Sequence, residues 1–314
     1  MLEHQLSYSI IIPTYNRPER LKTCLESIAN LNFPVEQFEV VIVDDGSAKP
    51  LDDLINSFNH KLSIQLIRQH NAGPATARNT GASQAKGKYL VFTDDDCQVD
   101  SNWLQAFDKG FNKNPHALLG GYTINALSNN LYSEASQLLV DYLYHYYNTD
   151  SEQAIFFTSN NFALSKQLFS EIGGFDTSFP LAAGEDRELC DRWLSHAYPM
   201  QYLPEAIIHH SHQLSLRKFW QQHFNYGCGA FYFHQVRSQR KQESIKVEPF
   251  TFYIQLLLYP FYTSSNQPKI LLSLLFSISQ IANILGFFWT RFKQKRAFDQ
   301  SINNAQISNK KQMT

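Results

Sequence analysis

Two features that this sequence has little of, cysteine and net charge, already exclude several kinds of protein. The four cysteines among 314 residues are scattered, and no two have the spacing of a zinc site or of a disulfide framework. A reducing compartment such as the cytoplasm is therefore expected. The formal net charge is −1, with 27 Lys and Arg against 28 Asp and Glu. Because cations are not in excess, we do not expect a protein that binds nucleic acid.

Glycine-rich nucleotide motifs and targeting signals are also missing. No GxGxxG follows the first predicted strand, so the dinucleotide fingerprint is absent, and no GxxxxGKS/T loop occurs. The first seven residues have neither a basic cluster nor a long apolar run, and we expect no signal peptide. A nucleotide, if bound, would have to be held by acidic side chains and a metal ion.

What the chain does have is a series of short apolar runs that are typical of buried strands. Four of them, at residues 8–13, 38–43, 62–67 and 89–92, alternate with helical patterns. This alternation predicts an α/β fold with a mostly parallel sheet flanked by helices. Hydrophobic residues make up 43% of the chain, which is enough for a sizeable core.

Aspartates follow two of these predicted strands. Asp44 and Asp45 come after the second strand, and Asp94, Asp95 and Asp96 come after the fourth. In open α/β sheets, ligands bind beyond the carboxyl ends of the strands. Three adjacent carboxylates repel one another unless they share a cation, and oxygen ligands of this kind suit Mg²⁺ or Mn²⁺. Taken alone, each group could equally be a solvated turn or a helix N-cap.

The second half of the chain predicts a less regular alternation. We expect helices at 103–111 and 131–147, and strands at 117–125, 156–164 and 202–208. The strand at 156–164 would return to the sheet of the first half, so both halves would share one sheet.

More acids and a group of histidines follow in this half. Glu185 and Asp186 begin another predicted helix, where the helix dipole stabilises negative charge. His209, His210 and His212 come directly after the last predicted strand. A single histidine there would more often be structural, but three within four residues favour a place in a functional site.

Six stretches are more informative together than alone: IIIPTYNR at 10–17, VIVDDGS at 41–47, NAGPATARN at 71–79, FTDDD at 92–96, GGFD at 173–176 and GEDREL at 184–189. In this order they resemble glycosyltransferase family 2, which has the GT-A fold, over roughly residues 7–235. The resemblance implies a nucleotide-sugar donor, first of all a UDP-sugar, a divalent metal ion and inversion at the anomeric carbon.

The resemblance assigns several residues near the first strand ends to the nucleotide. Pro13 and Tyr15 would line the pocket for the base. Asp45 would bind the base, with Asp44 beside it as a second candidate. Arg78 would lie near the nucleotide. The simpler alternatives are that Tyr15 belongs to the core and that Arg78 only pairs with a helix acid.

The resemblance gives the three adjacent acids different roles. Asp94 and Asp96 match the DxD pattern that binds Mn²⁺ or Mg²⁺, with Asp96 as the principal ligand. Asp95 would lie near the ribose. His210 best matches a position where the family often has a third metal ligand or a diphosphate contact.

The Glu185–Asp186 pair would supply the general base, and we prefer Asp186 to Glu185. Sugar transfer needs a metal that neutralises the leaving diphosphate and a carboxylate that takes the proton of the acceptor hydroxyl. We therefore expect an inverting glycosyltransferase with a glycan or lipid-linked acceptor, in cell-surface polysaccharide synthesis. One alternative, a sugar-phosphate nucleotidyltransferase, would need a glycine-rich basic loop where residues 14–18 stand. The other, a non-catalytic scaffold, would not need the acids.

The C-terminal third is aromatic and apolar. Residues 214–236 predict a helix with too many aromatic side chains to be exposed all round, so it should pack on a core or cover the acceptor side. Residues 249–262 and 270–289 are strongly apolar, and the second segment is about long enough to cross a bilayer. These segments predict an association with a membrane.

Polar and basic residues around the second segment favour a helix that lies on the membrane. Basic residues follow it at 291, 293, 295 and 296, which in a spanning helix would lie outside, against the positive-inside rule. We expect an interfacial helix at the cytoplasmic face of the cell membrane. The alternatives are a spanning helix, a re-entrant pair, and a soluble cap or dimer interface. One helical face carries a polar stripe of Ser273, Ser277, Gln280 and Asn283.

These observations divide the chain into three parts. Residues 1–236 form the predicted glycosyltransferase domain, with a nucleotide-binding half at 1–100 and an acceptor half at 101–236. Residues 237–298 form the membrane-associated extension, and residues 299–314 form a polar tail.

Overall fold

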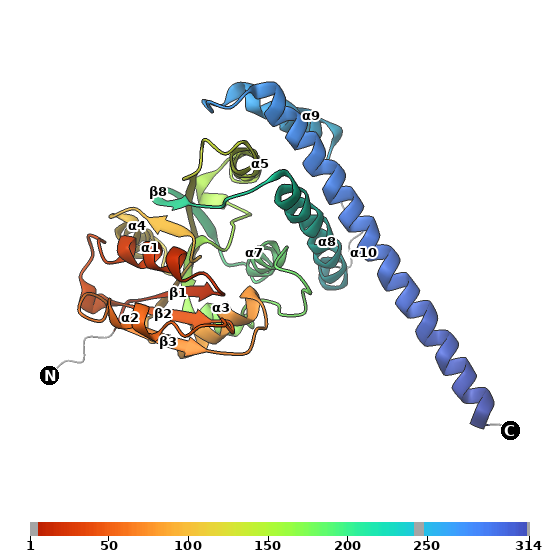
Figure 1. Ribbon diagram of the computed structural model, residues 1–314, viewed down its shortest axis with the longest axis horizontal. Coiled ribbons are helices and arrows are strands. Elements are labelled where there is room, and N and C mark those ends of the chain that lie inside the picture. Colours follow the sequence, from red (N-terminus) through yellow and green to blue (C-terminus); the bar gives the residue numbers. More distant parts are fainter. Residues whose placement is uncertain (1–5, 242–247, 313–314) are drawn as a thin grey trace.

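The molecule has a central sheet with helices on both faces and a long helix along one side (Figure 1). It is described from a computed structural model, for residues 6–241 and 248–312. Within these residues the sheet has eight strands in the order β3-β2-β1-β4-β7-β6-β8-β5. Four neighbouring pairs are parallel and three are antiparallel. The predicted α/β fold is confirmed, with a sheet that is mixed.

The first half forms as its alternation predicts. Its elements are β1 (Tyr8–Thr14), α1 (Pro18–Ile28), a 3-10 turn (Val35–Gln37), β2 (Phe38–Asp44), α2 (Asp52–Asn56), β3 (Ile64–Arg68), α3 (Pro74–Gln84) and β4 (Tyr89–Thr93). Pro18 and Pro74 begin α1 and α3, at a position where a helix needs no amide proton. The four strands run parallel, so their carboxyl ends lie at one edge of the sheet.

The second half extends the sheet with both parallel and antiparallel strands. Its elements are β5 (Cys97–Val99), α4 (Trp103–Lys113), β6 (Leu118–Asn125), α5 (Leu131–Tyr147), a 3-10 turn (Ser151–Gln153), β7 (Asn161–Ser165), α6 (Lys166–Glu171), α7 (Glu185–Ser195) and β8 (Met200–His210). The strand predicted at 156–164 begins only at Asn161. Before it, the Phe157 ring fills the space that a side chain at Gly120 would occupy, so this stretch packs as irregular chain. The three-residue β5 was not predicted.

Asn161 joins three strands where the register of the sheet shifts. The pairing of β6 with β8 slips between residues 121 and 122. The Asn161 amide donates to the carbonyls of Tyr122 at 2.9 Å and Ala206 at 3.0 Å, and its oxygen accepts from the Trp103 indole at 2.8 Å. Because Asn161 is fully buried, each of these groups would otherwise lack a partner, at a cost of about 1–3 kcal/mol.

Two hydrophobic clusters cover the two faces of the sheet. Alternate residues of a strand point to opposite faces. Ile10 and Ile12 accordingly join the cluster under α1, α2 and α4, whereas Ile11 joins the cluster under α3, α6 and α7. All three side chains are fully buried. The sheet edge with the strand ends is left for polar residues.

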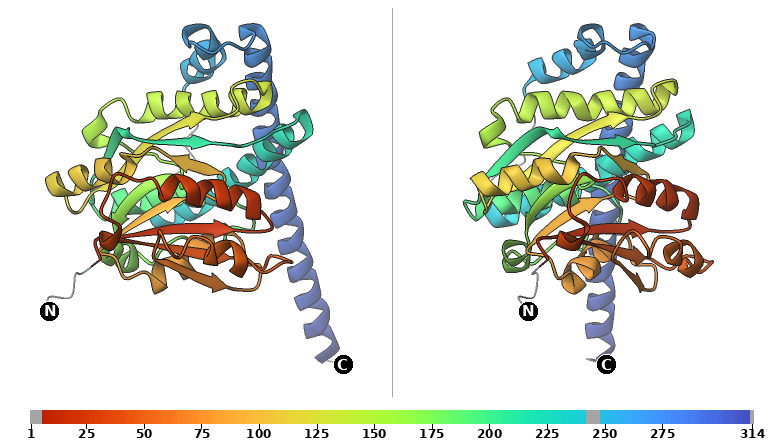
Figure 2. Two further views of the ribbon diagram at one scale, coloured as in Figure 1. Left: turned by 60° about the vertical axis from the view of Figure 1, so that its left-hand side comes forward. Right: turned by 90° about the vertical axis from the view of Figure 1, so that its left-hand side faces the viewer.

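The C-terminal helices form a separate layer in the described part of the chain. They are α8 (Leu216–Lys241), α9 (Phe250–Leu258) and α10 (Lys269–Gln312), with a 3-10 turn (Tyr259–Tyr262) before α10. α10 packs along α8 and continues beyond the body of the molecule (Figures 1 and 2). The two helices approach closely, since a side chain at Gly227 would collide with Asn283 and one at Gly286 with Phe224. Small residues allow the same close contact between helices in membranes.

The polar stripe of α10 faces the protein, whereas the polar face of an interfacial helix would meet water. Ser273 donates to the Leu257 carbonyl at 2.8 Å, and Asn283 lies against Gly227. Residues 269–296 are long and apolar enough to cross a membrane, by length and composition alone, with 33% of the apolar window buried. The outward side chains are 44–69% exposed: Ile270, Leu271, Leu274, Ile281, Ile284, Leu285, Phe288, Trp289 and Phe292.

Candidate active site

The ends of β1 and β4 bring two of the three adjacent aspartates against basic side chains at the start of α1. Thr14 donates its hydroxyl proton to Asp95 at 2.8 Å. Arg17 lies 3.2 Å from Asp95 and 3.4 Å from Asp96, and Arg20 lies 2.8 Å from Asp96. Arg17 and Arg20 were not predicted from the sequence as site residues. The one pattern that could have indicated them is their i, i+3 spacing, which places both on one side of a helix that begins beside the strand end.

Asp95 and Asp96 differ in pKa although both are buried. Burial and the neighbouring Asp96 raise the pKa of Asp95 to about 6. Burial also acts to raise the pKa of Asp96, but the hydrogen bond and charge of His210, followed by Arg17, bring it below its ordinary value. Asp96 is therefore an anion throughout the neutral range, as a metal ligand must be.

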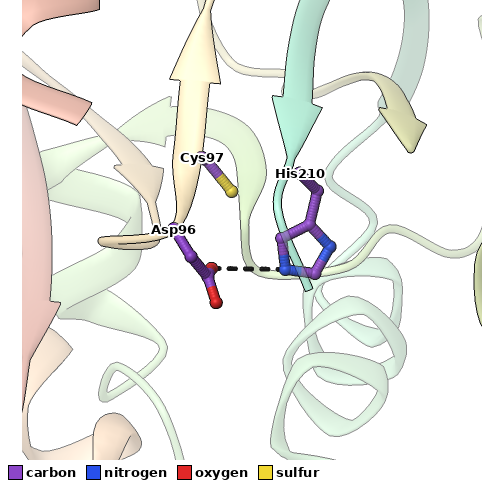
Figure 3. Close-up of side chains that lie close together, drawn as sticks. All are labelled: Asp96, Cys97 and His210. Carbon is purple, nitrogen blue, oxygen red and sulfur yellow. Dashed lines mark ion pairs between the residues drawn. The ribbon is translucent and has the colours of Figure 1, made fainter. Parts of the chain in front are cut away.

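The short strand β5 aims Asp96 at His210 (Figure 3). β5 pairs with β8, and Cys97 is the register partner of His210. Asp96 Oδ1 and His210 Nε2 are 3.2 Å apart. Two atoms that bind the same small cation, each at about 2.1 Å, have about this separation. The possible ligand atoms of Asp96, Cys97 and His210 all lie within 4.8 Å of one another.

Cys97 fits a hard metal ion less well than its two neighbours. It is fully buried, and burial with the charges of Asp94 and Asp96 raises the pKa of its thiol well above the ordinary value. A protonated thiol is not a metal ligand, and Mg²⁺ and Mn²⁺ prefer oxygen. Asp96 and His210 therefore suit a divalent ion whose other positions are taken by oxygen atoms of a ligand or of water.

Arg78 connects the strand-end acids to the acids of α7. Its guanidinium lies 2.6 Å from Asp94 and 3.7 Å from Glu185, and it packs 5.6 Å from the centre of the Phe175 ring. The side chain is buried, and its Nε and Nη1 have no hydrogen-bond partner among the described residues. Arg78 does pair with acids, as the simpler interpretation held, but they belong to the two acidic groups of the site.

The acid pair at the start of α7 is placed by a glycine and by helix α8. Gly184 has a φ of +92°, a conformation that favours glycine. A side chain at Gly229 of α8 would collide with Ala183, so α8 lies directly on the residues before the pair. Further along α8, Phe233 packs under the Arg187 guanidinium at 4.7 Å. α8 therefore helps to set the position of the acid pair.

Glu185 and Asp186 both hold their protons more tightly than ordinary carboxylic acids. Burial and the charge of Asp186 raise the pKa of Glu185 to about 7, although Arg78 acts in the opposite direction. Burial also raises the pKa of Asp186, against the hydrogen bond that its Oδ1 accepts from the Arg187 amide at 2.7 Å. A carboxylate with a raised pKa is a better proton acceptor near neutral pH.

Asp45 and Asp44 organise the loops at the neighbouring strand end. Asp45 accepts three hydrogen bonds, from Gln69 Nε2 at 2.7 Å and from the amides of Ala72 and Gly73 at 2.9 Å. Asp44 accepts from the amide three residues further on at 2.8 Å. Both carboxylates are buried. They therefore hold the loops at this edge of the sheet in place.

Pro13 and Tyr15 flank the end of β1. Pro13 is buried opposite Val43 of β2. Tyr15 is 47% exposed, so it is not a core residue and its ring is free to contact a ligand. The structure thus places Pro13 and Tyr15 at the same sheet edge as the five aspartates.

The three histidines after β8 separate into different environments. His209 turns away, and its Nε2 lies 2.9 Å from Asp100. His212 stacks on His210 with ring centres 5.2 Å apart, and burial with the charge of His210 lowers its pKa to about 4. His223 of α8 is buried nearby, and burial with His212 lowers its pKa to about 3. Two imidazoles that are neutral near pH 7 therefore lie near His210. His212 is one of the three histidines predicted at this strand end, whereas His223 was not predicted from the sequence.

Comparison with known sequences agrees with this geometry. The sequence profile described as Glycosyl transferase family 2 matches residues 9–173, a little more than half of the chain. Glycosyltransferase AglE of Haloferax volcanii is 36% identical over 100 residues, which cover 31% of this chain and 33% of AglE. The poly(ribitol-phosphate) beta-N-acetylglucosaminyltransferase TarS of Staphylococcus aureus is 31% identical over 102 residues, 32% of this chain and 18% of TarS. The aligned part thus spans a third or less of these relatives.

Solved structures resemble this chain over most of its length. The structure of TarS 1–349 in complex with UDP-GlcNAc has a TM-score of 0.53 at 15% identity and covers 93% of this chain and 92% of that one. The mannosyltransferase PcManGT from Pyrobaculum calidifontis, in complex with GDP-Man and Mn²⁺, has a TM-score of 0.61 at 16% identity, with coverages of 88% and 86%. At these identities the likeness is one of fold, and it confirms the expected GT-A architecture.

Proposed function

The chain belongs to glycosyltransferase family 2, and we propose that it is a metal-dependent, inverting enzyme that transfers a sugar from a nucleotide-sugar to a hydroxyl group. One observation carries the proposal. The buried Arg78 lies between Asp94, which neighbours the Asp96–His210 pair, and Glu185, which neighbours Asp186. One acidic group suits a metal and a leaving diphosphate, and the other suits a general base.

The donor would bind at the ends of β1 and β2. The exposed Tyr15 ring would pack on the base above Pro13, with Asp45 and Asp44 beside it and Asp95 near the ribose. A UDP-sugar is the first candidate because the TarS structure contains UDP-GlcNAc. The GDP-Man of the mannosyltransferase makes GDP-sugars the second.

The residues present fit a divalent ion, Mn²⁺ or Mg²⁺. Asp96 and His210 would hold it through the two atoms that lie 3.2 Å apart, and Asp94 would complete the DxD pattern. When bound, the ion would neutralise charge on the leaving diphosphate. Arg78, with two nitrogens that have no hydrogen-bond partner among the described residues, would add donors on the same side.

The general base would be Asp186, with Glu185 as its alternative. Asp186 would take the proton of the acceptor hydroxyl as that oxygen forms its bond to the anomeric carbon. The bond from this carbon to the diphosphate oxygen would break on the opposite face, so the configuration would invert. Glu185, which faces Arg78 at 3.7 Å, would keep the pair in place.

The acceptor would be a glycan or a lipid-linked sugar of a cell-surface polysaccharide. TarS, a poly(ribitol-phosphate) beta-N-acetylglucosaminyltransferase, supports the polymer class. We place the enzyme in the cytoplasm at the inner face of the cell membrane, with residues 237–298 as the membrane-associated part. The apolar outward face of α10, with basic residues at 291–296, supports this location.

Two substitutions test the chemistry. Asp96→Asn and Asp186→Asn should each lower the transfer rate by about 10²-fold or more while the protein stays folded. Asp100→Asn, which changes an acid whose side chain pairs with His209, is the matched control and should keep its activity. A screen of UDP- and GDP-sugars by thermal shift, with and without Mn²⁺, would identify the donor first. Full transfer activity in both site variants would disprove the assignment.

A vesicle experiment tests the location. Trp289→Glu with Phe292→Glu places charge on the exposed apolar face of α10. The double variant should lose co-flotation with anionic phospholipid vesicles, whereas Val35→Glu, at an exposed apolar residue of the 3-10 turn before β2, should not. Equal flotation of all three proteins would contradict membrane binding through α10.

A further inference from the structure

We infer that the face of α8 beside the acid pair is a binding subsite for a pyranose ring of the acceptor, with Tyr226 as its platform. This inference rests on the proposed transfer reaction and adds where the acceptor sugar lies. It follows from the helix geometry, from the unused hydrogen-bonding capacity of three side chains, and from the exposure of Tyr226.

Helix geometry puts Tyr226 next to the acid pair. Gln222, Tyr226, Gly229 and Phe233 recur every three to four residues and therefore share one face of α8. The second half of this face packs on α7, because Gly229 touches Ala183 and Phe233 packs under Arg187. Tyr226 lies one turn before these contacts, so it lies beside the chain that leads into α7 and is not covered by α7 itself. Its ring is 41% exposed, while Gly229 and Phe233 are buried.

One pair of rings lies at the metal end of the site, and a second pair on α8 includes Tyr226. His212 stacks on His210 at 5.2 Å, and the rings of His223 and Tyr226 are 5.4 Å apart and nearly perpendicular. His223 also lies within electrostatic reach of His212. Burial first, and then the charges of the nearby acids including Asp186, raise the pKa of the Tyr226 hydroxyl. The second pair of rings therefore lies on α8, within electrostatic reach of His212 and of the acid pair.

The Tyr226 hydroxyl is held by a neighbour but keeps its proton available. Gln222 Nε2 donates to the Tyr226 oxygen at 2.9 Å and to Ser136 of α5 at 2.9 Å. Among the described residues, no acceptor takes the Tyr226 proton. Gln222 Oε1 and His223 Nε2 are buried and also have no partner in the described chain. Buried polar groups are normally paired, so a ligand hydroxyl or a water molecule is expected to meet them.

These properties suit a sugar ring better than an apolar or an open-chain group. An aromatic face packs on the C–H face of a pyranose, and a polar rim of hydroxyl, amide and imidazole groups matches its hydroxyls. An acceptor ring on Tyr226 would place a hydroxyl near Asp186. A soluble glycan and a lipid-linked sugar share this ring chemistry, so both sources fit the subsite.

The test separates acceptor binding from donor chemistry. With the donor identified by the thermal-shift screen, donor hydrolysis and transfer are measured for wild type, Tyr226→Ala, Tyr226→Phe and the control Trp220→Ala. Trp220 is an exposed aromatic residue on another face of the same helix. The acceptors are methyl β-glycosides of glucose, galactose, mannose and N-acetylglucosamine, their octyl counterparts, and ribitol. Comparing methyl with octyl glycosides distinguishes soluble from lipid-like acceptors. Ribitol is the control for the ring, because it is an open chain with no ring face.

We expect Tyr226→Ala to raise the KM for the preferred glycoside about tenfold, with unchanged donor hydrolysis and donor-induced thermal shift. Tyr226→Phe should raise this KM about threefold, which is the effect of one hydrogen bond. Trp220→Ala should behave as wild type. Wild-type transfer kinetics in Tyr226→Ala would overturn the inference, as would a parallel loss of donor hydrolysis in Tyr226→Phe, or transfer to ribitol but to no glycoside. A wild-type protein that neither hydrolyses nor transfers any donor would instead overturn the proposed function, and the subsite with it.

Discussion

Replacing Glu185 by Gln should stabilise the protein at high pH and flatten the pH dependence of its stability. Glu185 is 5% exposed, and burial beside Asp186 raises its pKa from 4.5 to about 7 even though Arg78 lowers it. Between these two values the folded protein keeps a proton that the unfolded chain has lost. The free energy of unfolding therefore falls as the pH rises from about 4.5 to about 7.

The size of the effect follows from the shift. Each pKa unit corresponds to about 1.4 kcal/mol, so a change from 4.5 to about 7 corresponds to about 3 kcal/mol. Because Glu185 and Asp186 interact, this loss belongs to the pair. The pKa of Asp95 is raised to about 6, so Asp95 also lowers the free energy of unfolding as the pH rises from about 4 to 6. This contribution is present in both proteins and cancels in their difference.

The measurement is urea unfolding followed by circular dichroism at several pH values between about 5 and 8. The difference in unfolding free energy, Glu185→Gln minus wild type, should increase by about 2–3 kcal/mol across this range. Glu36→Gln, at an exposed acid in the 3-10 turn before β2, is the control and should follow wild type. If the unfolding free energies of wild type and Glu185→Gln changed with pH in parallel, Glu185 could not be a buried acid whose pKa lies near neutral pH.

Three further outcomes follow from the same contacts. Arg78→Met should lower the free energy of unfolding, measured in urea, by about 3 kcal/mol, because it leaves Asp94 and Glu185 without their buried cation. Arg17→Met, at a half-exposed cation, is the control and should lower it by less than about 1 kcal/mol. Gly229→Ala should destabilise the protein by about 1–3 kcal/mol and lower the transfer rate. The added methyl group would collide with Ala183, which precedes the acid pair by two residues. His210→Ala should raise the Mn²⁺ concentration for half-maximal transfer about tenfold or more, and an unchanged Mn²⁺ titration would remove His210 from the metal site.

The strand-end acids show which parts of the candidate site can be predicted from the sequence. The apolar run before Asp94 predicts a strand, and the fold confirms it. The acids at its carboxyl end predict a ligand site, which stays a prediction. The different orientations of Asp95 and Asp96 depend on β5, which has only three residues and no periodicity to detect. Asp96 faces His210 because β5 pairs with β8, more than a hundred residues away. Pairings of this length are set by the whole sheet.

Two other features escaped the sequence for related reasons. Arg17 and Arg20 meet Asp96 because β1 and β4 are neighbours in the sheet, and strand order cannot be read from local patterns. On α10, periodicity finds the stripe that includes Ser273 and Asn283, but it does not tell which side packs on the protein. Gly227 and Gly286 decide this by allowing α8 and α10 to meet along the polar side.

Helix α8 lies between the C-terminal extension and the acid pair of the candidate site. The boundary expected at residue 236 falls inside α8, which continues to Lys241. Gly227 contacts α10 and Gly229 contacts the residues before the acid pair. Two residues correspond to a rotation of about 200° along a helix, so these contacts lie on opposite sides of the same turn. We therefore expect a displacement of α10 to shift α8 against the residues that precede Glu185 and Asp186. Through this turn of α8, the position of α10 and that of the proposed general base would be coupled.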